Sequence, residues 1–564
     1  MSVGVRRGPT VDEHADSVVE QSRAGRIYGP STGPQAPARS VRILVVASEA
    51  PPVRSGVASV VGYLAEGLER RGHHVDVIAY PDIGRLAFGD IRFSSLIFKV
   101  PRLLRRIDDY DIIHIHGATP TVSDVALLVA GRRRHHPAVV YTHHMDLALG
   151  AGNRLTSLYN YLHCRLSAGA DAVVATTYEN LADDSSRGQV IALGVDLDRF
   201  TTSGPKDTQF TVLFIGQFRP YKGVRVLLKA LSHVPKVRLL LAGHGPEEQA
   251  YRSLVAELGL DVEFHVDVDD HQLRELYRRA HAVVLPAVSR REAFGLVLVE
   301  GMAAGCVPIA SDLPGVREVV ARAGFLFPSG DATRLAGILH GLHDNPALIQ
   351  HVANRARTRA VEFSRANTIR EYERLITGLA ACRDLKIRLA DHGPQYASAL
   401  HRFVADVANT LEAEWAEMVL CPTEFEQCAV ASAGSLKLSD SHLRRVSSRL
   451  AWYAVNTAAS TLVAPNDGLL DLGDAMVIDR EPPAAMVAPL TFADGPFGAL
   501  LLMRERPFGQ RDLANLRCFA RSAAPSLRAI SDKSIFFNRG RAAIVGAADA
   551  GDQSDASGVA TSGV

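Results

Sequence analysis

The 564-residue sequence is poor in cysteine, and its six cysteines are scattered without a Cys-x-x-Cys pair. That spacing offers neither a zinc site nor a disulfide framework, and it is typical of a protein from a reducing compartment. The sequence also lacks any apolar run of the roughly 18 residues that a membrane-spanning helix needs. Its first residues, MSVGVRR, do not contain the apolar core of a signal peptide. We therefore expect a cytoplasmic protein.

The sequence also lacks an excess of charge of either sign. It has 62 Lys and Arg against 61 Asp and Glu, a net charge of +1, which gives no electrostatic reason to expect nucleic acid as a partner. Two basic clusters, Arg102–Arg106 and Arg132–His136, are local patches on this neutral background. They could place the protein at the inner face of an anionic membrane, although solvated helix ends are the simpler interpretation.

Both ends of the sequence lack apolar periodicity. Residues 1–40 are rich in Gly, Pro, Ser and charge, and residues 540–564 are rich in Ala, Gly, Ser and Asp. Such segments bury too little apolar surface to fold, so we expect both to be disordered. With 47% apolar residues, the remainder is long enough for three or four domains.

Short apolar segments alternate with amphipathic helical segments from Val41 onward. Before residue 200 the strand-like segments are Ile43–Ala47, Val75–Ala79, Ile112–Ile115, Ala138–Tyr141 and Ala172–Ala175. Strands that alternate with helices predict a parallel, doubly wound sheet. A polar linker at 201–209 precedes a second such series. We predict an α/β protein with two tandem Rossmann-like domains, at 41–200 and 210–380, and a ligand cleft between them.

The pattern changes after residue 380. We expect a long helix over 395–417, a hairpin over 486–503 with an Asp494–Gly495 turn, and a helix over 512–527. This arrangement resembles a GAF domain, an α+β sensor or dimerisation module, at 395–530. An apolar stripe on the first helix could bind a second copy of the chain or the module's own core: Leu400, Phe403, Val407 and Leu411. We expect a homodimer, and a folded monomer after truncation at residue 385.

Two carboxylates, Glu292 and Glu300, are separated by seven mostly apolar residues directly after a strand-like segment. Gly295 lets the backbone approach a ligand, and the open amides of a helix N-terminus bind anionic oxygens. Glu300, within the helix, can accept two hydrogen bonds from a ribose diol, which leaves Glu292 to face the group beyond the diphosphate. The alternative is a solvated loop glutamate and an ordinary helix glutamate.

The loop Phe214–Gly223, the turn Leu240–Pro246, this carboxylate pair and the segment Gly324–Asp331 follow one another along the chain. As a set they resemble the retaining glycosyltransferases of the family-4 type, which have the GT-B fold, over roughly 41–379. The resemblance implies a nucleotide-sugar donor, linked to uridine or guanosine diphosphate, and no cofactor or metal. It also implies a set of donor-binding residues: Gly56, Gly216, Arg219, Lys222, Gly245, Phe294, Gly295, Leu296 and Glu300.

A departing diphosphate needs fixed cations where its charge develops. Lys222 is the first candidate and Arg219 the second, because the family's usual arginine position is occupied by Gln217. Two surface cations are the alternative. Ser55–Gly56 resembles the family's Gly-Gly loop, with Ser55 in place of the first glycine, although an ordinary strand-to-helix turn would have the same pattern.

His116 lies at the carboxyl end of a strand-like segment, where active sites of parallel sheets collect. By resemblance it approaches the donor sugar and acts in catalysis with Glu292, Lys222 and Arg219. His114 is expected to be a structural histidine. The segment Tyr141–Asp146 is expected to face the acceptor, with His144 as the candidate contact. A metal site there is disfavoured, because adjacent histidines rarely share one ion.

The sequence thus predicts a retaining glycosyltransferase that moves a sugar from a nucleoside-diphosphate donor to a hydroxyl of a glycan, glycolipid or small acceptor. No residue stands out as a covalent nucleophile, and the resemblance implies a same-face displacement rather than a double displacement. The alternative from another class is a non-catalytic nucleotide-sugar sensor that signals through the GAF-like module. A phosphorylase or glucan synthase would use the same pocket with another acceptor.

Overall fold

The computed structural model describes residues 40–53, 55–79, 85–88, 91–94, 107–130, 137–144, 154–181, 188–391, 396–423, 426–434, 440–464, 483–493 and 495–531. The segments 1–39 and 540–564, both basic clusters, Asp146 and Asp494 lie outside these ranges, so the expectations for them stay untested. None of the helices in the described ranges combines the length and the apolar character needed to span a bilayer.

The first sheet has six parallel strands in the order β2-β1-β5-β6-β7-β8. Its strands are β1 (Arg42–Val46), β2 (His74–Ile78), β5 (Ile112–Gly117), β6 (Ala138–His143), β7 (Ala172–Ala175) and β8 (Gly188–Val190). Successive residues of β1 enter two different cores, Ile43 and Val45 on one face, Leu44 and Val46 on the other. A sheet covered on both faces explains why these strands are continuously apolar.

Helices α1 (Gly56–Glu69), α4 (Ser123–Ala130) and α5 (Arg154–Ser167) accompany this sheet. The strand order reverses between β1 and β5, which makes the carboxyl ends of these two strands the switch point where ligands bind in such sheets. A short hairpin, β3 (Arg85–Phe88) with β4 (Ile91–Ser94), was not expected from the sequence.

The second sheet is also parallel, in the order β11-β10-β9-β12-β13-β14. The strands are β9 (Thr211–Ile215), β10 (Arg238–Ala242), β11 (Val262–His265), β12 (Ala282–Leu285), β13 (Val307–Ser311) and β14 (Phe325–Phe327). Numbered within the domain, this is the Rossmann order 3-2-1-4-5-6, with its switch point between β9 and β12. Both predicted parallel sheets are therefore present.

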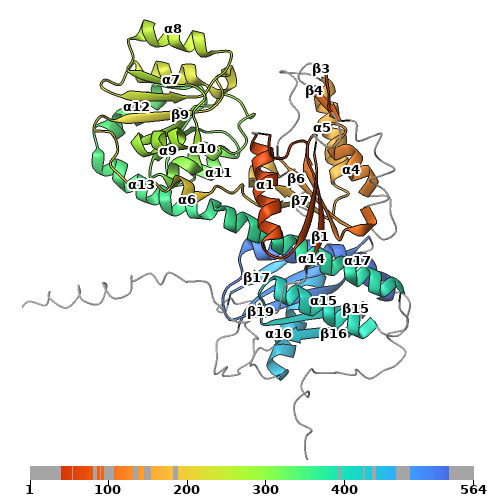
Figure 1. The fold of residues 1–564 in the computed structure, drawn as a ribbon. Helices are drawn as coiled ribbons and strands as arrows, with labels where there is room; N and C mark the ends of the chain where they lie inside the picture. The colour runs from red at the N-terminus through yellow and green to blue at the C-terminus, as the bar shows by residue number, and fades with distance from the viewer. Residues whose placement is uncertain are drawn as a thin grey trace, which may run out of the picture. The chain divides into compact units, whose positions relative to one another are not determined.

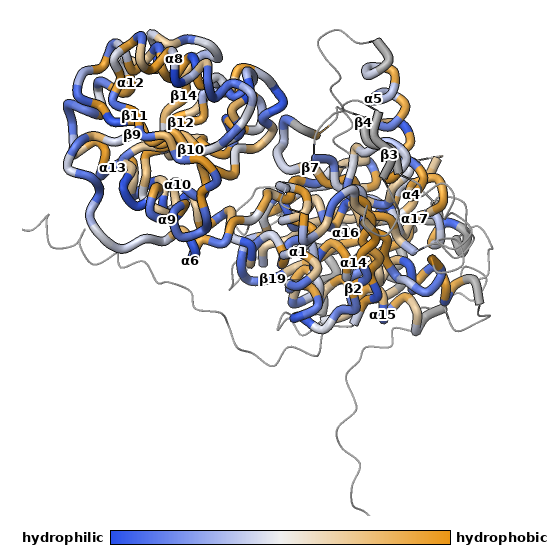
Figure 2. The backbone as a smooth tube through the Cα atoms, turned by 45° about the horizontal axis from the view of Figure 1, so that its top comes forward, coloured by the Kyte–Doolittle hydropathy of each residue, from blue (hydrophilic) through white to orange (hydrophobic). Residues whose placement is uncertain are grey.

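Helices cover both faces of this second sheet (Figure 1). One face packs against α7 (Val224–Leu231), α8 (Glu248–Leu258) and α12 (Ala332–His343). The other packs against α9 (Asp270–Arg279), α10 (Leu296–Ala303), α11 (Val316–Val320) and α13 (Pro346–Ala360). Figure 2 shows hydrophobic residues along β10 and β12, as expected for strands buried on both faces.

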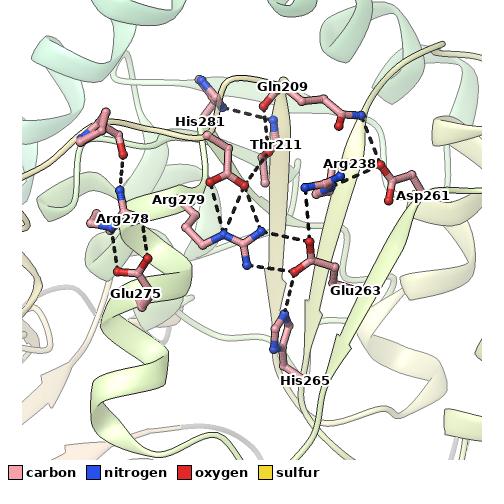
Figure 3. A network of polar contacts seen from close by, with 12 residues as sticks. Gln209, Thr211, Arg238, Asp261, Glu263, His265, Glu275, Arg278, Arg279 and His281 are labelled. Carbon is pink, nitrogen blue, oxygen red and sulfur yellow. Dashed lines mark hydrogen bonds and ion pairs between the residues drawn. The ribbon is translucent and has the colours of Figure 1, made fainter.

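A polar network ties the linker before β9 to the edge of this sheet (Figure 3). The Arg279 guanidinium donates to both Glu263 carboxylate oxygens, at 2.9 and 3.0 Å, and to Asp207 at 3.0 Å. These two carboxylates raise the pKa of Arg279. The linker is thus fixed at the amino-terminal ends of the strands, whereas the candidate site lies at their carboxyl-terminal ends.

The C-terminal region contains an antiparallel sheet in the order β16-β15-β19-β18-β17. It comprises β15 (Trp415–Thr423), β16 (Glu426–Gly434), β17 (Thr461–Val463), β18 (Ala484–Phe492) and β19 (Gly495–Arg504), with helices α15 (Tyr396–Thr410), α16 (Asp440–Thr457) and α17 (Gln510–Ser531). The β18–β19 hairpin and α17 match the sequence expectation. The helix expected over 395–417 ends at Thr410 instead, because Glu412 takes a left-handed φ of 53° and turns the chain into β15.

A 27-residue helix, α14 (Arg365–Asp391), joins the second sheet's domain to this module. Its apolar residues belong to one core shared by α1, β1, α15 and α17. The stripe of Leu400, Phe403, Val407 and Leu411 lies in that same core, with each side chain at most 2% exposed. Of the two interpretations of the stripe, the structure supports the intramolecular one, so a dimer would need another surface.

Candidate active site

The loop after β9 brings Lys222 and Glu292 together. Lys222 ends a short 3-10 turn, η3 (Pro220–Lys222), and its ammonium donates to the Glu292 carboxylate in an ion pair. The two side chains are only 16% and 12% exposed. Gly223 follows with a φ of 71°, and a Cβ there would lie 1.9 Å from the Pro286 carbonyl oxygen. Only glycine permits this contact between the β9 loop and the end of β12.

Arg219, the second predicted cation, is exposed. Its Nε donates to the Gln217 side chain at 3.0 Å, and it forms no ion pair with a carboxylate among the described residues. Gln217, which occupies the family's usual arginine position, therefore orients Arg219, the arginine expected to act in its place. Lys222 is charge-compensated and mostly buried, whereas the exposed Arg219 side chain can turn toward an anion.

Glu292 and Glu300 flank the start of α10, after β12. Gly295 is the helix N-cap, with a φ of 83°, and α10 begins with Leu296. Phe294 is buried and its ring packs edge-on against Phe363. Phe294 can thus offer a ligand only its backbone. The carboxyl ends of β9 and β12 meet at the switch point, so the predicted residues lie together for a topological reason.

Glu300 has a different environment from Glu292. One of its carboxylate oxygens accepts a hydrogen bond of 2.6 Å from the Tyr277 hydroxyl. Burial raises the pKa of Glu300 to about 7, although the Tyr277 hydrogen bond and the charges of Arg199 and Arg365 oppose the rise. Burial and the neighbouring Glu300 carboxylate raise the pKa of Tyr277 well above its usual value, so it stays a donor.

Tyr277 was missed from the sequence, because it occupies an ordinary core position of the amphipathic helix α9. Its contact with Glu300 spans 23 residues and depends on how α9 and α10 pack. Lys206, in the linker before β9, was missed because its contacts also depend on how distant segments pack. Its ammonium donates to the carbonyls of Tyr277 and Ala304, at 3.1 and 3.0 Å. Ala304 is the C-cap residue of α10, so the ammonium caps the end of that helix.

The predicted glycines Gly216 and Gly245 lie in two loops that are hydrogen-bonded to one another. The Phe218 amide donates to the His244 carbonyl at 2.8 Å, and the Glu247 amide donates to the Phe218 carbonyl at 3.1 Å. A Cβ on Gly245 would lie 2.6 Å from the Phe218 carbonyl oxygen. The loop containing Arg219 is therefore held against the turn after β10.

Three histidines form a cluster at the switch point of the first sheet. His114 and His116 lie on the same face of β5, with ring centroids 4.2 Å apart. His144, just after β6, shares a 2.9 Å hydrogen bond between its Nε2 and the Nδ1 of His116, and their rings stack. Burial lowers the pKa of His114 to about 3, of His144 to about 4, and of His116 well below its usual value. All three are neutral at pH 7.

The predicted Ser55–Gly56 loop starts α1 after β1. Ser55 is the N-cap, and its hydroxyl accepts a hydrogen bond from the Ala58 amide at 3.1 Å. Gly56 is exposed, and a Cβ there would meet nothing within 4 Å. Packing within the chain does not explain the glycine, whereas the serine has a structural task as a helix cap.

His143 faces away from the histidine cluster and toward Tyr141. The Tyr141 hydroxyl is 2.7 Å from the Nε2 of His163, whose Nδ1 is 2.6 Å from an Asp124 carboxylate oxygen. The adjacent His143, at the end of β6, and His144, just after it, thus form hydrogen bonds in separate networks. In the described part of the chain, no group of three His, Cys, Asp or Glu side chains could hold a metal ion.

Two family models match adjacent parts of the chain. Residues 54–199 match the model described as Glycosyltransferase Family 4, and residues 198–359 match Glycosyl transferases group 1. The phosphatidyl-myo-inositol mannosyltransferase of Mycolicibacterium smegmatis is 31% identical over 365 residues, which cover 57% of this chain and 90% of the relative. The O-antigen chain mannosyltransferase C of Escherichia coli is 28% identical, covering 58% and 96%. Among solved structures, a glycosyltransferase from Rickettsia africae is similar with a TM-score of 0.49 and 18% identity, covering 60% of this chain and 98% of that one.

The two Rossmann-like sheets and the matched families define a glycosyltransferase of the GT-B type that transfers a sugar from a nucleotide-sugar donor. More specifically, the chain belongs to glycosyltransferase family 4, a retaining family, over residues 54–359. The antiparallel C-terminal region lies beyond the matched residues.

Proposed function

We propose that this enzyme is a retaining hexosyltransferase whose first donor to test is GDP-mannose and whose acceptor is a lipid-linked or glycan hydroxyl. The placement of Lys222, Glu292 and Glu300 around the β9–β12 switch point carries the proposal. Two similar proteins are named as mannosyltransferases, and one of them acts on phosphatidyl-myo-inositol by its name. Such an acceptor would bring a cytoplasmic enzyme to an anionic membrane.

In the proposed site Lys222 and Arg219 neutralise the diphosphate, together with the open amides of α10. An ammonium has three donors, so Lys222 can keep its bond to Glu292 while it donates to a phosphate oxygen. Glu300 accepts from the ribose diol. Glu292, held by Lys222, faces the sugar. Gly56, Gly216, Gly245 and Gly295 allow backbone contact with the donor, alongside the amides of Phe294 and Leu296.

His116 is the proposed contact to the donor sugar, and His144 orients it while facing the acceptor side. A neutral His116 can donate or accept one hydrogen bond without adding charge to a sugar that becomes cationic in the transition state. The leaving diphosphate oxygen then accepts the acceptor's proton on the same face of the sugar. This same-face displacement accounts for retention without a covalent intermediate.

A GAF-like identity of the C-terminal module is a second part of the proposal. Numbered within the module, its sheet order is 2-1-5-4-3, with α16 packed on one face and α15 and α17 on the other. Such a module would bind a small ligand or a second chain. A nucleotide-sugar sensor without turnover remains the rival function, and the pairing of Lys222 with Glu292 favours the enzyme.

A thermal-shift panel of nucleotide sugars tests the donor, followed by product analysis with lipid-linked and free hydroxyl acceptors. A ligand at 100 times its dissociation constant should add about 2.7 kcal/mol of stability. Stabilisation without transfer to any acceptor would support the sensor. Transfer of the sugar from a sugar phosphate to an acceptor, with release of inorganic phosphate, would support a phosphorylase. No stabilisation by any nucleotide sugar would contradict both the enzyme and the sensor.

Replacement of Lys222 by Ala tests the phosphate role. We expect kcat to fall roughly 100-fold, about 2.7 kcal/mol of transition-state stabilisation, because only the exposed Arg219 and the helix amides then neutralise the leaving diphosphate. Lys229→Ala removes an exposed lysine from the next helix, α7, and serves as the control. Near-normal turnover of Lys222→Ala would remove this residue from the site.

A further inference from the structure

A chain of buried hydroxyl groups joins the histidine cluster to α14. The Tyr372 hydroxyl, on α14, is 2.9 Å from the Thr142 hydroxyl oxygen on β6. That oxygen is 2.8 Å from the Nε2 of His114 on β5. The rings of Tyr372 and His114 also contact each other, with centroids 5.1 Å apart. All three side chains are at most 1% exposed, so water does not compete for these bonds.

The direction of this chain follows from a count of its hydrogens. Each hydroxyl has one hydrogen, and neutral His114 has one ring N–H. In one arrangement the Tyr372 hydroxyl donates to Thr142, and the Thr142 hydroxyl donates to the Nε2 of His114; only the Nδ1–H of His114 then lacks a partner among the described residues. In the reverse arrangement the Nε2–H of His114 donates to Thr142, and Thr142 donates to Tyr372. Both the Tyr372 hydroxyl hydrogen and the lone pair on His114 Nδ1 then lack a partner. The first arrangement leaves fewer buried polar groups unsatisfied and fixes one tautomer of His114.

The fixed ring of His114 packs directly against His116, at 4.2 Å between centroids. His116 has one nitrogen bonded to His144, while its Nε2 is buried and has no partner in the described chain. A buried polar nitrogen without a partner is costly unless a ligand satisfies it. The orientation of this nitrogen therefore depends on two neighbours, His144 on one side and His114 with its hydroxyl chain on the other.

The same helix, α14, is seated in the core of the C-terminal module. Gly378, six residues after Tyr372, packs so closely that a Cβ there would lie 1.9 Å from the Phe519 ring on α17. Tyr372 and Phe519 belong to one core cluster. Because packed interiors do not deform freely, a shift of α17 would also displace the residues of α14 that pack against it.

We propose that Tyr372 is a positioning residue for His116, and that through it the packing of the C-terminal module on α14 sets the turnover of the transferase. This inference rests on the proposed role of His116 at the donor sugar. It gives the module a physical route to the active site that needs no contact between the module and the substrate.

The full-length enzyme tests the first part with the donor and acceptor found by the panel. Tyr372→Phe and Thr142→Val each remove one hydroxyl and keep the side chain's shape, and we expect kcat to fall about fivefold, the rate equivalent of one net hydrogen bond, with KM for the donor unchanged. The double variant should be no slower than either single one, and Thr142→Ser should restore turnover.

Tyr110→Phe, which removes a buried hydroxyl bonded to Asp76, is the matched control and should leave kcat unchanged. Reduced stability with normal kcat in Tyr372→Phe and Thr142→Val, or additive losses in the double variant, would overturn the positioning role.

Phe519→Leu and Gly378→Ala test the second part, because each alters the α14–α17 contact far from the site. We expect kcat to fall two- to fivefold at constant donor KM, and to fall no further when Phe519→Leu is combined with Tyr372→Phe. Normal kcat in both folded module variants would overturn the coupling. If the wild-type enzyme transfers no sugar at all, the proposed function fails first, which distinguishes that outcome from failure of this inference.

Discussion

Glu292 and Glu300 are chemically the same side chain, yet their surroundings separate their tasks. Glu292 is paired with a lysine ammonium, whereas Glu300 accepts from an uncharged tyrosine hydroxyl in a partly buried position. A carboxylate that burial desolvates, without a formal counter-ion at contact distance, is harder to ionise. The pKa of about 7 for Glu300 follows from this desolvation.

Glu292→Gln should therefore reduce turnover without weakening donor binding. The substitution removes a negative charge beside Lys222, so a diphosphate should bind as tightly as before or tighter. We expect kcat to fall about 100-fold, since a neutral amide replaces the carboxylate that faces the sugar in the proposed site. Calorimetry with the nucleoside diphosphate and steady-state kinetics measure the two effects separately. Weaker diphosphate binding with intact kcat would reverse the roles assigned here.

Donor affinity should also depend on pH through Glu300. Only the ionised carboxylate accepts both ribose hydroxyls, so a proton must leave before binding when the pH is below the pKa of about 7. We expect the dissociation constant of a nucleotide sugar to be about tenfold larger at pH 6 than at pH 8. Glu300→Gln should bind weakly at both pH values. An equally steep pH dependence in that variant would exclude Glu300 as the titrating group.

At the scale of elements, the switch points of the two sheets decide where function lies. In the first sheet β5 presents His114 and His116 on one face, and in the second sheet the loops after β9 and β12 present Lys222 and Glu292. In each parallel sheet these groups lie close together, because the carboxyl ends of all its strands are on the same side of the sheet. The histidine cluster has a thermodynamic consequence, since the folded state keeps its members neutral.

Stability should fall as the pH decreases below about 6.5. The folded pKa values of His114 and His144 lie at about 3 and about 4, below the unfolded value of 6.5. The unfolded chain thus binds protons first on acidification, and each such histidine reduces the free energy of unfolding by about 1.4 kcal/mol for each pH unit between the two values. Urea unfolding at pH 7.5 and 5.5 measures this loss.

His144→Gln provides the control, because it removes one of the titrating rings. Between pH 7.5 and 5.5 the variant should lose about 1.4 kcal/mol less than the wild type. Identical losses in the two proteins would show that His144 is protonated equally easily in the folded and unfolded states.

At the scale of the whole molecule, α14 and α17 connect the C-terminal module to the first sheet. The Cys518 thiol donates to the Asp171 carbonyl at 3.3 Å, and the Gln189 amide donates to the Ala514 carbonyl at 3.2 Å. Arg383 on α14 pairs with Asp111 at 2.9 Å. Together with the shared apolar core, these contacts make the module part of the fold.

Truncation after residue 385 should therefore give an aggregated or unstable protein, against the expectation from the sequence. Removal of α15 and α17 exposes the α14 residues Leu375, Leu379 and Cys382, all buried in the full chain. Solubility and light scattering of the truncated chain measure this. Truncation after residue 531, which keeps α17, is the control and should stay folded. A soluble, cooperatively folding chain ending at residue 385 would contradict the role of the shared core.

The local pattern of the sequence was enough to predict the two parallel sheets, their approximate strands and the residues at their carboxyl ends. Alternating strand and helix periods dictate a doubly wound sheet, and such a sheet dictates which loops converge. Lys222, Glu292 and Glu300 could be placed near one another for this reason. Lys222 and Glu292 are 70 residues apart, and they meet because β9 and β12 are neighbours in the sheet.

Contacts between distant elements were decided only by the tertiary structure. Tyr277 beside Glu300, Tyr372 beside Thr142, and the burial of Leu400 and Phe403 each depend on how two helices or a helix and a sheet pack. An amphipathic helix has an apolar stripe whether that stripe meets its own domain, another domain or a second chain. The sequence determines that such a stripe must be buried, whereas side-chain packing across the whole fold determines what buries it.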